Sequence, residues 1–309
     1  MTPPATMSGT STTQSEPWTI QRLLQWTSEY FKKCGSTSPR LDAEVLLADA
    51  CGYQRIDLYA KFNEEPTEEI KSKFRELVRR RAAHEPVAYL VGKKEFYSLP
   101  FQVDASCLIP RGETEHVVIE AIDRIRKLEP TAMPQIADVC TGSGCIAVAV
   151  AKHAPNCRVI AIDVSPAALQ VAQRNVALHA VQDRVQLVHG DLIASLPDQS
   201  LDFVLSNPPY VSDAEFDALD RTVREHEPRI ALVAGPTGRE IIDPLIQQSA
   251  AKLKDDGWLI CELSPMIAQA VHDTLVADHR WTRVGLVRDL AGKQRVIVAQ
   301  RSSRTTSNS

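Results

Sequence analysis

The second half of the chain alternates short apolar runs with longer amphipathic segments, and this alternation is the strongest constraint on its fold. From residue 135 onward, the runs at 135–140 and 158–163 are each followed by a turn and by a segment with helical periodicity. Later segments continue the pattern, with a helix predicted over 238–253, a strand over 258–263, a helix over 267–275 and two strands within 281–300. Strands that alternate with helices are typical of α/β proteins with a parallel, doubly wound sheet, which is the fold we predict.

The N-terminal part of the chain, residues 18–92, has helical periodicity instead and carries no recognisable catalytic motif. Apolar residues of the segment 20–31 share one helical face. Ser38 and Pro39 have the residue types that begin a helix, and a third helical pattern starts near Thr67. We therefore predict a small all-helical unit, and our hypothesis for its role is recognition of a partner.

Residues 93–112 connect the two parts. Aromatic and aliphatic residues cluster within 95–104, as in a short β-hairpin. Arg111 and the polar residues up to Glu115 then precede an amphipathic helix, with which the predicted catalytic domain, 113–301, begins. These polar residues could face a ligand or could simply cap the helix, and the pattern favours neither.

Composition limits the classes of function. The chain has 309 residues with 35 Lys and Arg against 39 Asp and Glu, a net charge of −4, so it has no general electrostatic attraction for nucleic acid phosphates. Its seven scattered cysteines predict reduced thiols, and without a C-x-x-C or H-E-x-x-H pattern we expect no metal site. No apolar stretch approaches the roughly 20 residues of a membrane span, so we expect a cytoplasmic protein. We expect residues 1–17 and 302–309 to be flexible tails.

A turn that contains two glycines follows the first strand of the alternating half. Gly142 and Gly144 permit a tight turn whose backbone N–H groups approach a ligand closely. The next strand ends in Asp163, near the spacing at which an acidic residue receives ribose hydroxyls, although Asp163 also fits a helix cap before Ser165. The third strand ends beside Asp191, which places another carboxylate at the same sheet edge, where adenine could lie.

This turn differs from a dinucleotide-binding turn in two ways. Ala147 stands where a third glycine would fall, and Asp138 precedes the turn, where its charge would repel a pyrophosphate. A carboxylate at that position suits a cationic ligand, such as the amino group or sulfonium of S-adenosylmethionine. We therefore predict S-adenosylmethionine as the cofactor.

The apolar run that starts at Leu201 ends in Asn207-Pro208-Pro209-Tyr210, and the two prolines must stop the strand in a stiff turn. An NH2 group on an sp2 carbon has two donors, and the Asn207 side-chain oxygen and the Pro208 carbonyl could accept one each. Tyr210 could cover the flat face of such a group. The turn therefore predicts a site that holds a planar nitrogen against a methyl donor, although a proline-terminated strand would contain the same residues.

Together these motifs resemble the release-factor glutamine methyltransferases, the HemK family of protein-(glutamine-N5) methyltransferases, over about residues 18–301. The segments that carry the resemblance are Leu41–Glu44 with Leu46 and Leu47, Glu85–Tyr89 with Gly92, Glu95 and Phe96, Pro110 and Arg111, Thr114 and Glu115, Asp138–Gly144, Asn207–Tyr210, Glu227–Arg229, and Asp289–Gly292.

The resemblance implies a helical N-terminal domain that helps to dock the release factor, followed by a Rossmann-like, seven-stranded, S-adenosylmethionine-dependent catalytic domain. The implied substrate is the glutamine amide of the Gly-Gly-Gln motif in class 1 release factors. No nucleic acid or membrane partner is implied, and we expect a monomer.

The resemblance also implies which residues form the site. The cofactor would be bound by Asp138, Cys140, Thr141, Gly142, Ser143, Gly144, Asp163, Asp191, Leu192 and Asn207. The glutamine would be bound by Asn207, Pro208, Pro209, Tyr210 and Arg111, of which Asn207, Pro208 and Tyr210 are the predicted catalytic residues. Cys140 stands where methyltransferases frequently have glycine, and because cysteine tolerates positive φ poorly, we expect it in an ordinary backbone region.

Three alternatives remain open at this point. The Asn-Pro-Pro-Tyr turn also resembles methyltransferases that act on exocyclic amines of nucleic acid bases, but the acidic net charge and the helical unit favour a protein substrate. Ribosomal-protein glutamine methyltransferases are similar in both domains, whereas Pro110-Arg111, Thr114-Glu115 and 289–292 favour the release-factor branch. The third alternative is that the chain is not an enzyme but a noncatalytic module that binds the cofactor.

Overall fold

The computed structural model describes residues 17–303, and contacts within the chain divide it into two compact units between Ala83 and His84. Most of both predicted tails, residues 1–16 and 304–309, lies outside the described residues. Each unit has its own buried core, and each is described by itself below.

The first unit is all helical, as predicted. Its helices are α1 (Ile20–Lys33), α2 (Pro39–Cys51), α3 (Arg55–Ala60) and α4 (Glu68–Ala82). The Thr19 hydroxyl accepts from the Arg22 N–H and begins α1, and the Thr67 hydroxyl begins α4 in the same way. The helices enclose a core of large apolar residues that are almost fully buried: Ile20, Leu24, Phe31, Leu46, Leu47, Leu58 and Phe74. The six-residue helix α3 was not predicted, because it is too short to show a helical period.

The second unit begins with helix α5 (Val87–Val91) and a hairpin of β1 (Lys93–Phe96) and β2 (Leu99–Gln102). The aromatic side chains Phe96 and Phe101 are almost fully buried in the same core cluster as the helix after the hairpin. This packing ties the hairpin to the second unit. The contact boundary lies earlier than the predicted boundary after Gly92, because α5 also packs against this unit through the hydrogen bond from the Tyr89 hydroxyl to the Cys107 carbonyl.

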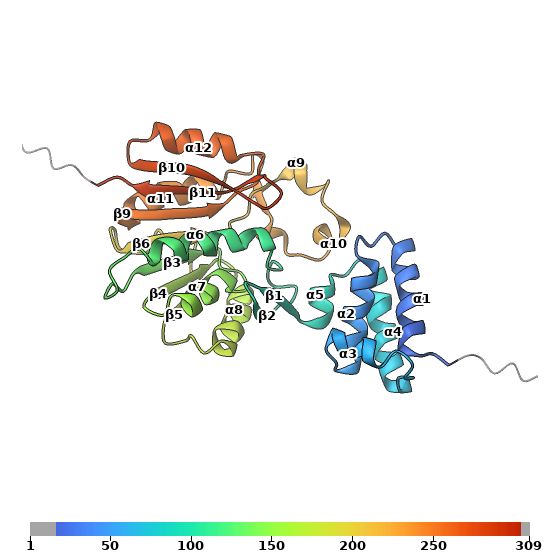
Figure 1. Ribbon diagram of the computed structural model, residues 1–309. Helices are drawn as coiled ribbons and strands as arrows, with labels where there is room; N and C mark the ends of the chain where they lie inside the picture. The colour runs from blue at the N-terminus through green and yellow to red at the C-terminus, as the bar shows by residue number, and fades with distance from the viewer. Residues whose placement is uncertain (1–16, 304–309) are drawn as a thin grey trace, which may run out of the picture. The chain divides into compact units, whose positions relative to one another are not determined.

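A seven-stranded sheet forms the centre of the second unit, in the order β10-β11-β9-β6-β3-β4-β5 (Figure 1). Its strands are β3 (Gln135–Val139), β4 (Arg158–Asp163), β5 (Val185–His189), β6 (Leu201–Ser206), β9 (Leu253–Glu262), β10 (Trp281–Arg288) and β11 (Gln294–Arg301). The strands β5, β4, β3, β6 and β9 run parallel. The strand β11 is antiparallel to both β9 and β10, unlike a fully parallel sheet, because the short turn between β10 and β11 cannot make a parallel crossover.

Helices cover both faces of this sheet (Figure 1). Their bounds are α6 (Glu115–Ile125), α7 (Cys145–His153), α8 (Pro166–Leu178), α11 (Ile242–Lys252) and α12 (Ala268–Ala277). Successive strand residues point to opposite faces, so in β6 Phe203 and Leu205 join the core under α6 and α7, whereas Val204 joins the core under α11 and α12. Helix α11 is shorter than the predicted 238–253 helix, and β9 begins at Leu253, five residues before the predicted strand.

Short elements complete the second unit. They are the 3-10 turns η1 (Gly112–Thr114) and η2 (Arg229–Ala231), the helices α9 (Asp213–Phe216) and α10 (Arg221–Arg224), and the parallel pair β7 (Val211–Ser212) and β8 (Val233–Gly235). Within residues 17–303, none of the helices has the length and apolar character needed to cross a membrane. The same part of the chain contains no group of three or more His, Cys, Asp or Glu side chains placed to hold a metal ion.

The central position of β3 determines where a ligand can bind. After β3 the chain continues to β4 and β5 on one side of β3. It then crosses to β6 on the other side of β3, and β9 pairs with β6, so the strand order reverses at β3. Crevices outside the carboxyl ends of strands at such a switch point are the usual ligand sites of open α/β sheets. The carboxyl ends of β3, β4 and β6 therefore mark the candidate site.

Candidate active site

A cavity lies at these carboxyl ends and holds about 700 Å³ of empty space, its open mouth included. The predicted residues that line it are Cys140, Thr141, Gly142, Ser143, Asp163, Asn207 and Pro209. Thr114 also lines the cavity, and it is one of the polar residues before α6 that could have faced a ligand or capped the helix. The remaining lining residues were not predicted: Ser106, Cys107, Leu108, Pro110, Cys145, Ile146, Val164, Ser165, Ala168, Ile230 and Ala231.

The turn between β3 and α7 forms one wall of the cavity. Gly142 and Gly144 have φ of 56° and 80°, in the left-handed region that glycine adopts without strain. A Cβ on Gly144 would lie 3.2 Å from the Ala172 Cβ, so this glycine also lets α7 pack closely against α8. The Gly142 N–H donates to Asp163 Oδ2 at 2.8 Å, which joins the turn to the end of β4.

Cys140 is also left-handed, with φ of 59°, so the prediction of an ordinary backbone region there was wrong. The chain leaves β3 at this residue, and the next N–H, of Thr141, donates to the Ile162 carbonyl of β4 at 2.9 Å. That bond fixes the path of the turn, and Cys140 adopts the conformation that the path demands. The Cys140 side chain remains partly buried against the core under α11 and α12.

Asp138, in β3, stabilises the turn through hydrogen bonds. It is fully buried, and its Oδ2 accepts from the Thr141 hydroxyl at 2.5 Å and from the Ala147 N–H at 3.0 Å. Its Oδ1 has no hydrogen-bond partner among the described residues. Burial is the main reason that the pKa of Asp138 rises to about 7, and the nearby charge of Asp163 raises it further. Asp138 does not line the cavity surface, although it shapes the wall.

Asp163 ends β4 at the cavity. Its two oxygens accept from the Gly142 N–H and from the Ser165 N–H, both at 2.8 Å. Burial raises its pKa, and these N–H donors oppose that rise. A carboxylate has about four lone-pair sites, so Asp163 retains capacity to accept from the hydroxyls of a ligand. The cap of α8 is Ser165, whose hydroxyl accepts from the Ala168 N–H.

Two predicted cofactor residues, Asp191 and Leu192, lie outside the cavity lining. Asp191 is exposed, and Leu192 is buried in the core under α11 and α12 with φ of 52°. Neither residue lines the cavity in this structure.

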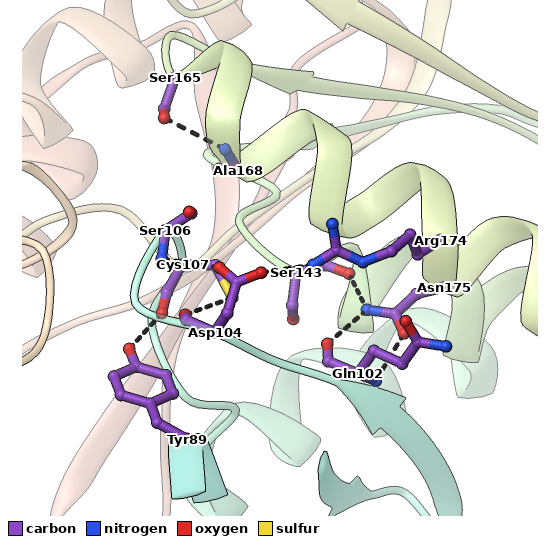
Figure 2. A network of polar contacts seen from close by, with 10 residues as sticks. All are labelled: Tyr89, Gln102, Asp104, Ser106, Cys107, Ser143, Ser165, Ala168, Arg174 and Asn175. Carbon is purple, nitrogen blue, oxygen red and sulfur yellow. Dashed lines mark hydrogen bonds and ion pairs between the residues drawn. The ribbon is translucent and has the colours of Figure 1, made fainter. Parts of the chain in front are cut away.

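The segment after the hairpin forms the opposite wall, and a network of polar contacts holds it in place (Figure 2). Asn175 of α8 is fully buried, accepts from the Gln102 N–H at 2.7 Å, and donates to the carbonyls of Gln102 and Ser143. The Tyr89 hydroxyl donates to the Cys107 carbonyl at 2.5 Å. Asn175 thus connects the hairpin to the glycine-containing turn.

The end of β6 presents Asn207 to the cavity. Asn207 Nδ2 donates to the Thr114 hydroxyl at 3.0 Å, and that hydroxyl donates to Glu262 Oε2 at 2.6 Å. The Tyr210 hydroxyl donates to Glu262 Oε1 at 2.9 Å. Tyr210 is therefore held at its hydroxyl end, and neither it nor Pro208 lines the cavity in this structure. Sequence reasoning missed Glu262, for which the available signal was an acidic residue at the end of a strand-like apolar run.

Arg111, a predicted substrate residue, does not line the cavity either. Its Nη2 lies 2.5 Å from Oε1 of the buried Glu227, whose Oε2 accepts from the Ile109 N–H at 3.1 Å. Arg111 and Glu227 therefore hold the wall segment that contains Leu108 and Pro110.

Three thiols line the cavity, those of Cys107, Cys140 and Cys145. Burial raises the pKa of Cys107 to about 12 and raises the pKa of Cys140 and of Cys145 well above the ordinary range. The nearby carboxyl of Asp138 contributes to the rise at the last two. Since the thiolate is the nucleophilic form, these protonated thiols are weak nucleophiles at neutral pH.

Comparisons with known proteins show which family the chain resembles. A family model described as the PrmC N-terminal domain matches residues 22–92, and one described as the methyltransferase small domain matches residues 124–229. The release factor glutamine methyltransferase of Rhodopirellula baltica is 50% identical over 293 residues, which are 94% of this chain and 99% of that protein. The protein of the same name from Geobacter sulfurreducens is 41% identical over 84% of this chain and 89% of its own length.

Among solved structures, the catalytic domain of hMettl16, in complex with a MAT2A 3′UTR hairpin, aligns with a TM-score of 0.53. It covers 72% of this chain and 81% of its own at 16% identity, so the likeness concerns the fold alone. The relatives at 50% and 41% identity match over most of their length and span both units. The chain therefore belongs to the release factor glutamine methyltransferase family.

Proposed function

We propose that this chain transfers a methyl group from S-adenosylmethionine to the side-chain nitrogen, N5, of the glutamine in the Gly-Gly-Gln motif of class 1 release factors. The observation that carries the proposal is the orientation of Asn207. Its Nδ2 is used by Thr114, so its Oδ1 is the acceptor that remains at the cavity. An acceptor at this position suits a substrate nitrogen with two N–H donors. The relatives are named release factor glutamine methyltransferases, and this supports the release factor as the substrate.

The residues of the cavity fit S-adenosylmethionine. A Cβ added to Gly142 would meet no atom closer than 4.0 Å, so the backbone there borders open space. The unpartnered Oδ1 of Asp138 is a buried acceptor beside the turn, and Asp163 can accept from ribose hydroxyls. The proposed cofactor residues are Asp138, Cys140, Thr141, Gly142, Ser143, Gly144, Asp163 and Asn207, with Asp191 and Leu192 on the adenine side. When bound, the cofactor supplies an electrophilic methyl group on a sulfonium.

The chain's contribution to the reaction is positioning. Asn207 Oδ1 and the Pro208 carbonyl each accept one N–H of the glutamine amide and direct its nitrogen toward the methyl donor. Such orientation can lower a barrier by up to about 7 to 11 kcal/mol. No strong general base is required, because an N-methylated amide nitrogen readily loses its extra proton to water. The protonated cavity thiols compete poorly for the methyl group.

We further propose that residues 18–92 recognise the release factor, that 113–301 carry out the transfer, and that Arg111, Pro209 and Tyr210 shape the glutamine site. The match of the PrmC N-terminal domain model to residues 22–92 supports the first assignment. We place the protein in the cytoplasm as a monomer with no nucleic acid requirement.

The test incubates the protein with S-adenosylmethionine and purified release factors and locates the methyl group by peptide mass spectrometry. We expect one methyl on the Gly-Gly-Gln glutamine. Asn207→Ala should lose roughly 3 kcal/mol of transition-state stabilisation, about 100-fold in rate. Asn156→Ala is the matched control, because Asn156 precedes β4 at the opposite end of the strands. A methyl on a ribosomal protein instead, or full activity of Asn207→Ala, would overturn the proposal.

A further inference from the structure

A chain of three hydrogen bonds connects Asn207 to two residues from other elements. Asn207 Nδ2 donates to Thr114 Oγ1, Thr114 Oγ1 donates to Glu262 Oε2, and the Tyr210 hydroxyl donates to Glu262 Oε1. Thr114 comes from the end of η1 and Glu262 from the end of β9, and each is 1% exposed. Glu262 does not line the cavity. It can therefore act on a bound substrate only through its neighbours.

The charge state of Glu262 determines the direction of every bond in this chain. An ionised carboxylate has acceptors only, so both hydroxyl hydrogens must point to it. Thr114 then has only lone pairs left for Asn207 and can receive an N–H but cannot donate. The NH2 group of Asn207 must face Thr114, and its carbonyl oxygen must face away from Thr114.

A neutral side chain at position 262 would allow the opposite direction. A donor at 262 could donate to Thr114 Oγ1, and the Thr114 hydroxyl could then donate to Asn207 Oδ1. The NH2 group of Asn207 would then be the group left for the substrate. The NH2 group of Asn207 would then face the NH2 group of the substrate. Because both groups are donors, no hydrogen bond would hold the substrate nitrogen.

We propose that Glu262 is a positioning residue that acts through Thr114 to hold the carbonyl oxygen of Asn207 toward the substrate nitrogen. This inference rests on the proposed function, since it concerns how that site binds an amide. Glu262 selects between the two orientations of the Asn207 amide, which differ little in shape and completely in hydrogen-bonding direction.

The groups around Glu262 have opposing effects on its pKa, and the net effect is that the pKa is raised. Burial raises the pKa of Glu262, and the charge of Glu113 raises it further. The hydroxyls of Thr114 and Tyr210 and the positive charge of Arg295 lower it. Arg295 is itself held by Asp289, 3.0 Å from its Nε. Loss of one hydroxyl donor should therefore shift the pKa of Glu262 upward.

The experiment compares Glu262→Gln, Thr114→Val, Thr114→Ser and Tyr210→Phe with the unmodified chain, using release-factor methylation from pH 5 to 9. Thr114→Ser retains the hydroxyl, and we expect its kcat to stay within about threefold. Thr114→Val and Glu262→Gln should each lower kcat by about 10-fold or more, as expected when a polar group near the substrate is misdirected. Their affinity for S-adenosylmethionine, measured by calorimetry, should change by less than about threefold.

Three further readouts separate positioning from a purely structural role. The double variant Thr114→Val/Glu262→Gln should lose no more activity than the worse single variant, because both changes break one chain of bonds. The acid limb of the pH profile should move to higher pH in Tyr210→Phe and should disappear in Glu262→Gln. Melting temperatures should show that each variant remains folded during the assay.

The outcomes also separate this inference from the proposed function. If the unmodified chain methylates the release factor and Glu262→Gln is equally active with the same pH profile, the inference is wrong and the function stands. Additive losses in the double variant would also refute it. If the unmodified chain neither methylates release factors nor binds them in the presence of S-adenosylhomocysteine, the proposed function fails and the inference falls with it.

Discussion

Arg111 and Glu227 lie 116 residues apart in the sequence, and their side chains meet at 2.5 Å. The Glu227 side chain is 1% exposed and that of Arg111 is 33% exposed, so the pair joins a buried carboxylate to a partly solvated guanidinium. The same carboxylate accepts from the Ile109 N–H. This ion pair fastens the cavity wall at Leu108 and Pro110 to the loop that precedes η2.

Removing the charge of Arg111 should destabilise the protein. Arg111→Met keeps most of the volume but leaves the buried Glu227 carboxylate without its cation, which we expect to cost about 2 kcal/mol after allowing for solvent at Arg111. In Arg111→Met/Glu227→Gln the buried charge is absent, and part of that loss should be recovered. Urea unfolding curves measure both values. A double variant less stable than Arg111→Met would contradict this account of the pair.

Asn175 should be a second position of high sensitivity. Asn175→Leu has a similar size but leaves the Gln102 N–H and the Gln102 and Ser143 carbonyls without their partner. We expect a loss of about 3 kcal/mol in the free energy of unfolding, because buried backbone groups would be unsatisfied. Gln170→Leu, on the exposed face of α8, is the control and should change stability by less than about 0.5 kcal/mol. Equal effects of the two substitutions would show that the buried amide has no special role.

The parts of the site that could be predicted are those specified by local sequence. The glycine-containing turn, Asp163 and Asn207 each end a strand-like run, and parallel strands bring their carboxyl ends to one edge, where these residues line the cavity. Glu262 could not be placed in this way, since its hydrogen bond to Thr114 joins residues 148 positions apart. No local period encodes such a pairing. For the same reason, the pairing of Arg111 with Glu227, 116 positions away, could not be predicted from the sequence.

Because Cys140 has a left-handed backbone conformation, we expect a glycine variant at this position to be more stable than a valine variant. Cys140→Gly should relieve about 1 to 2 kcal/mol of backbone strain while losing roughly 1 kcal/mol of buried side chain, so its melting temperature should stay close to that of the unmodified chain. Cys140→Val has a similar size to cysteine but is β-branched, and at φ of 59° it should be destabilised by about 2 kcal/mol or more. Differential scanning calorimetry compares the two. A valine variant as stable as the glycine variant would refute strain at this residue.

The buried carboxyl of Asp138 should make stability depend on pH. Its pKa is raised from 3.8 to about 7, so between these values the folded chain binds a proton that the unfolded chain releases. This proton contributes to the free energy of unfolding. Its contribution is fully present below about pH 4, is lost as pH rises through 7, and amounts to roughly 4 kcal/mol at its largest. In Asp138→Asn this fall should be absent, so the variant should equal or exceed the unmodified chain in stability at pH 8.

The control for this sign is Asp278, whose pKa is lowered, chiefly by its hydrogen bond to Arg280. The stabilisation by Asp278 is present above its unfolded pKa and is lost as pH falls through its folded pKa. Asp278→Asn should therefore be less stable than the unmodified chain at pH 8, and the two should have similar stability at low pH. Urea unfolding at intervals from pH 2 to 8 tests both variants, because the contribution of Asp138 changes between about pH 4 and 7 and that of Asp278 changes below about pH 4. If Asp138→Asn and Asp278→Asn changed the pH dependence in the same direction, Asp138 would not carry the buried proton. If Asp138→Asn also bound S-adenosylmethionine more weakly at pH 8, its unpartnered Oδ1 would be identified as an acceptor for the cationic part of the cofactor.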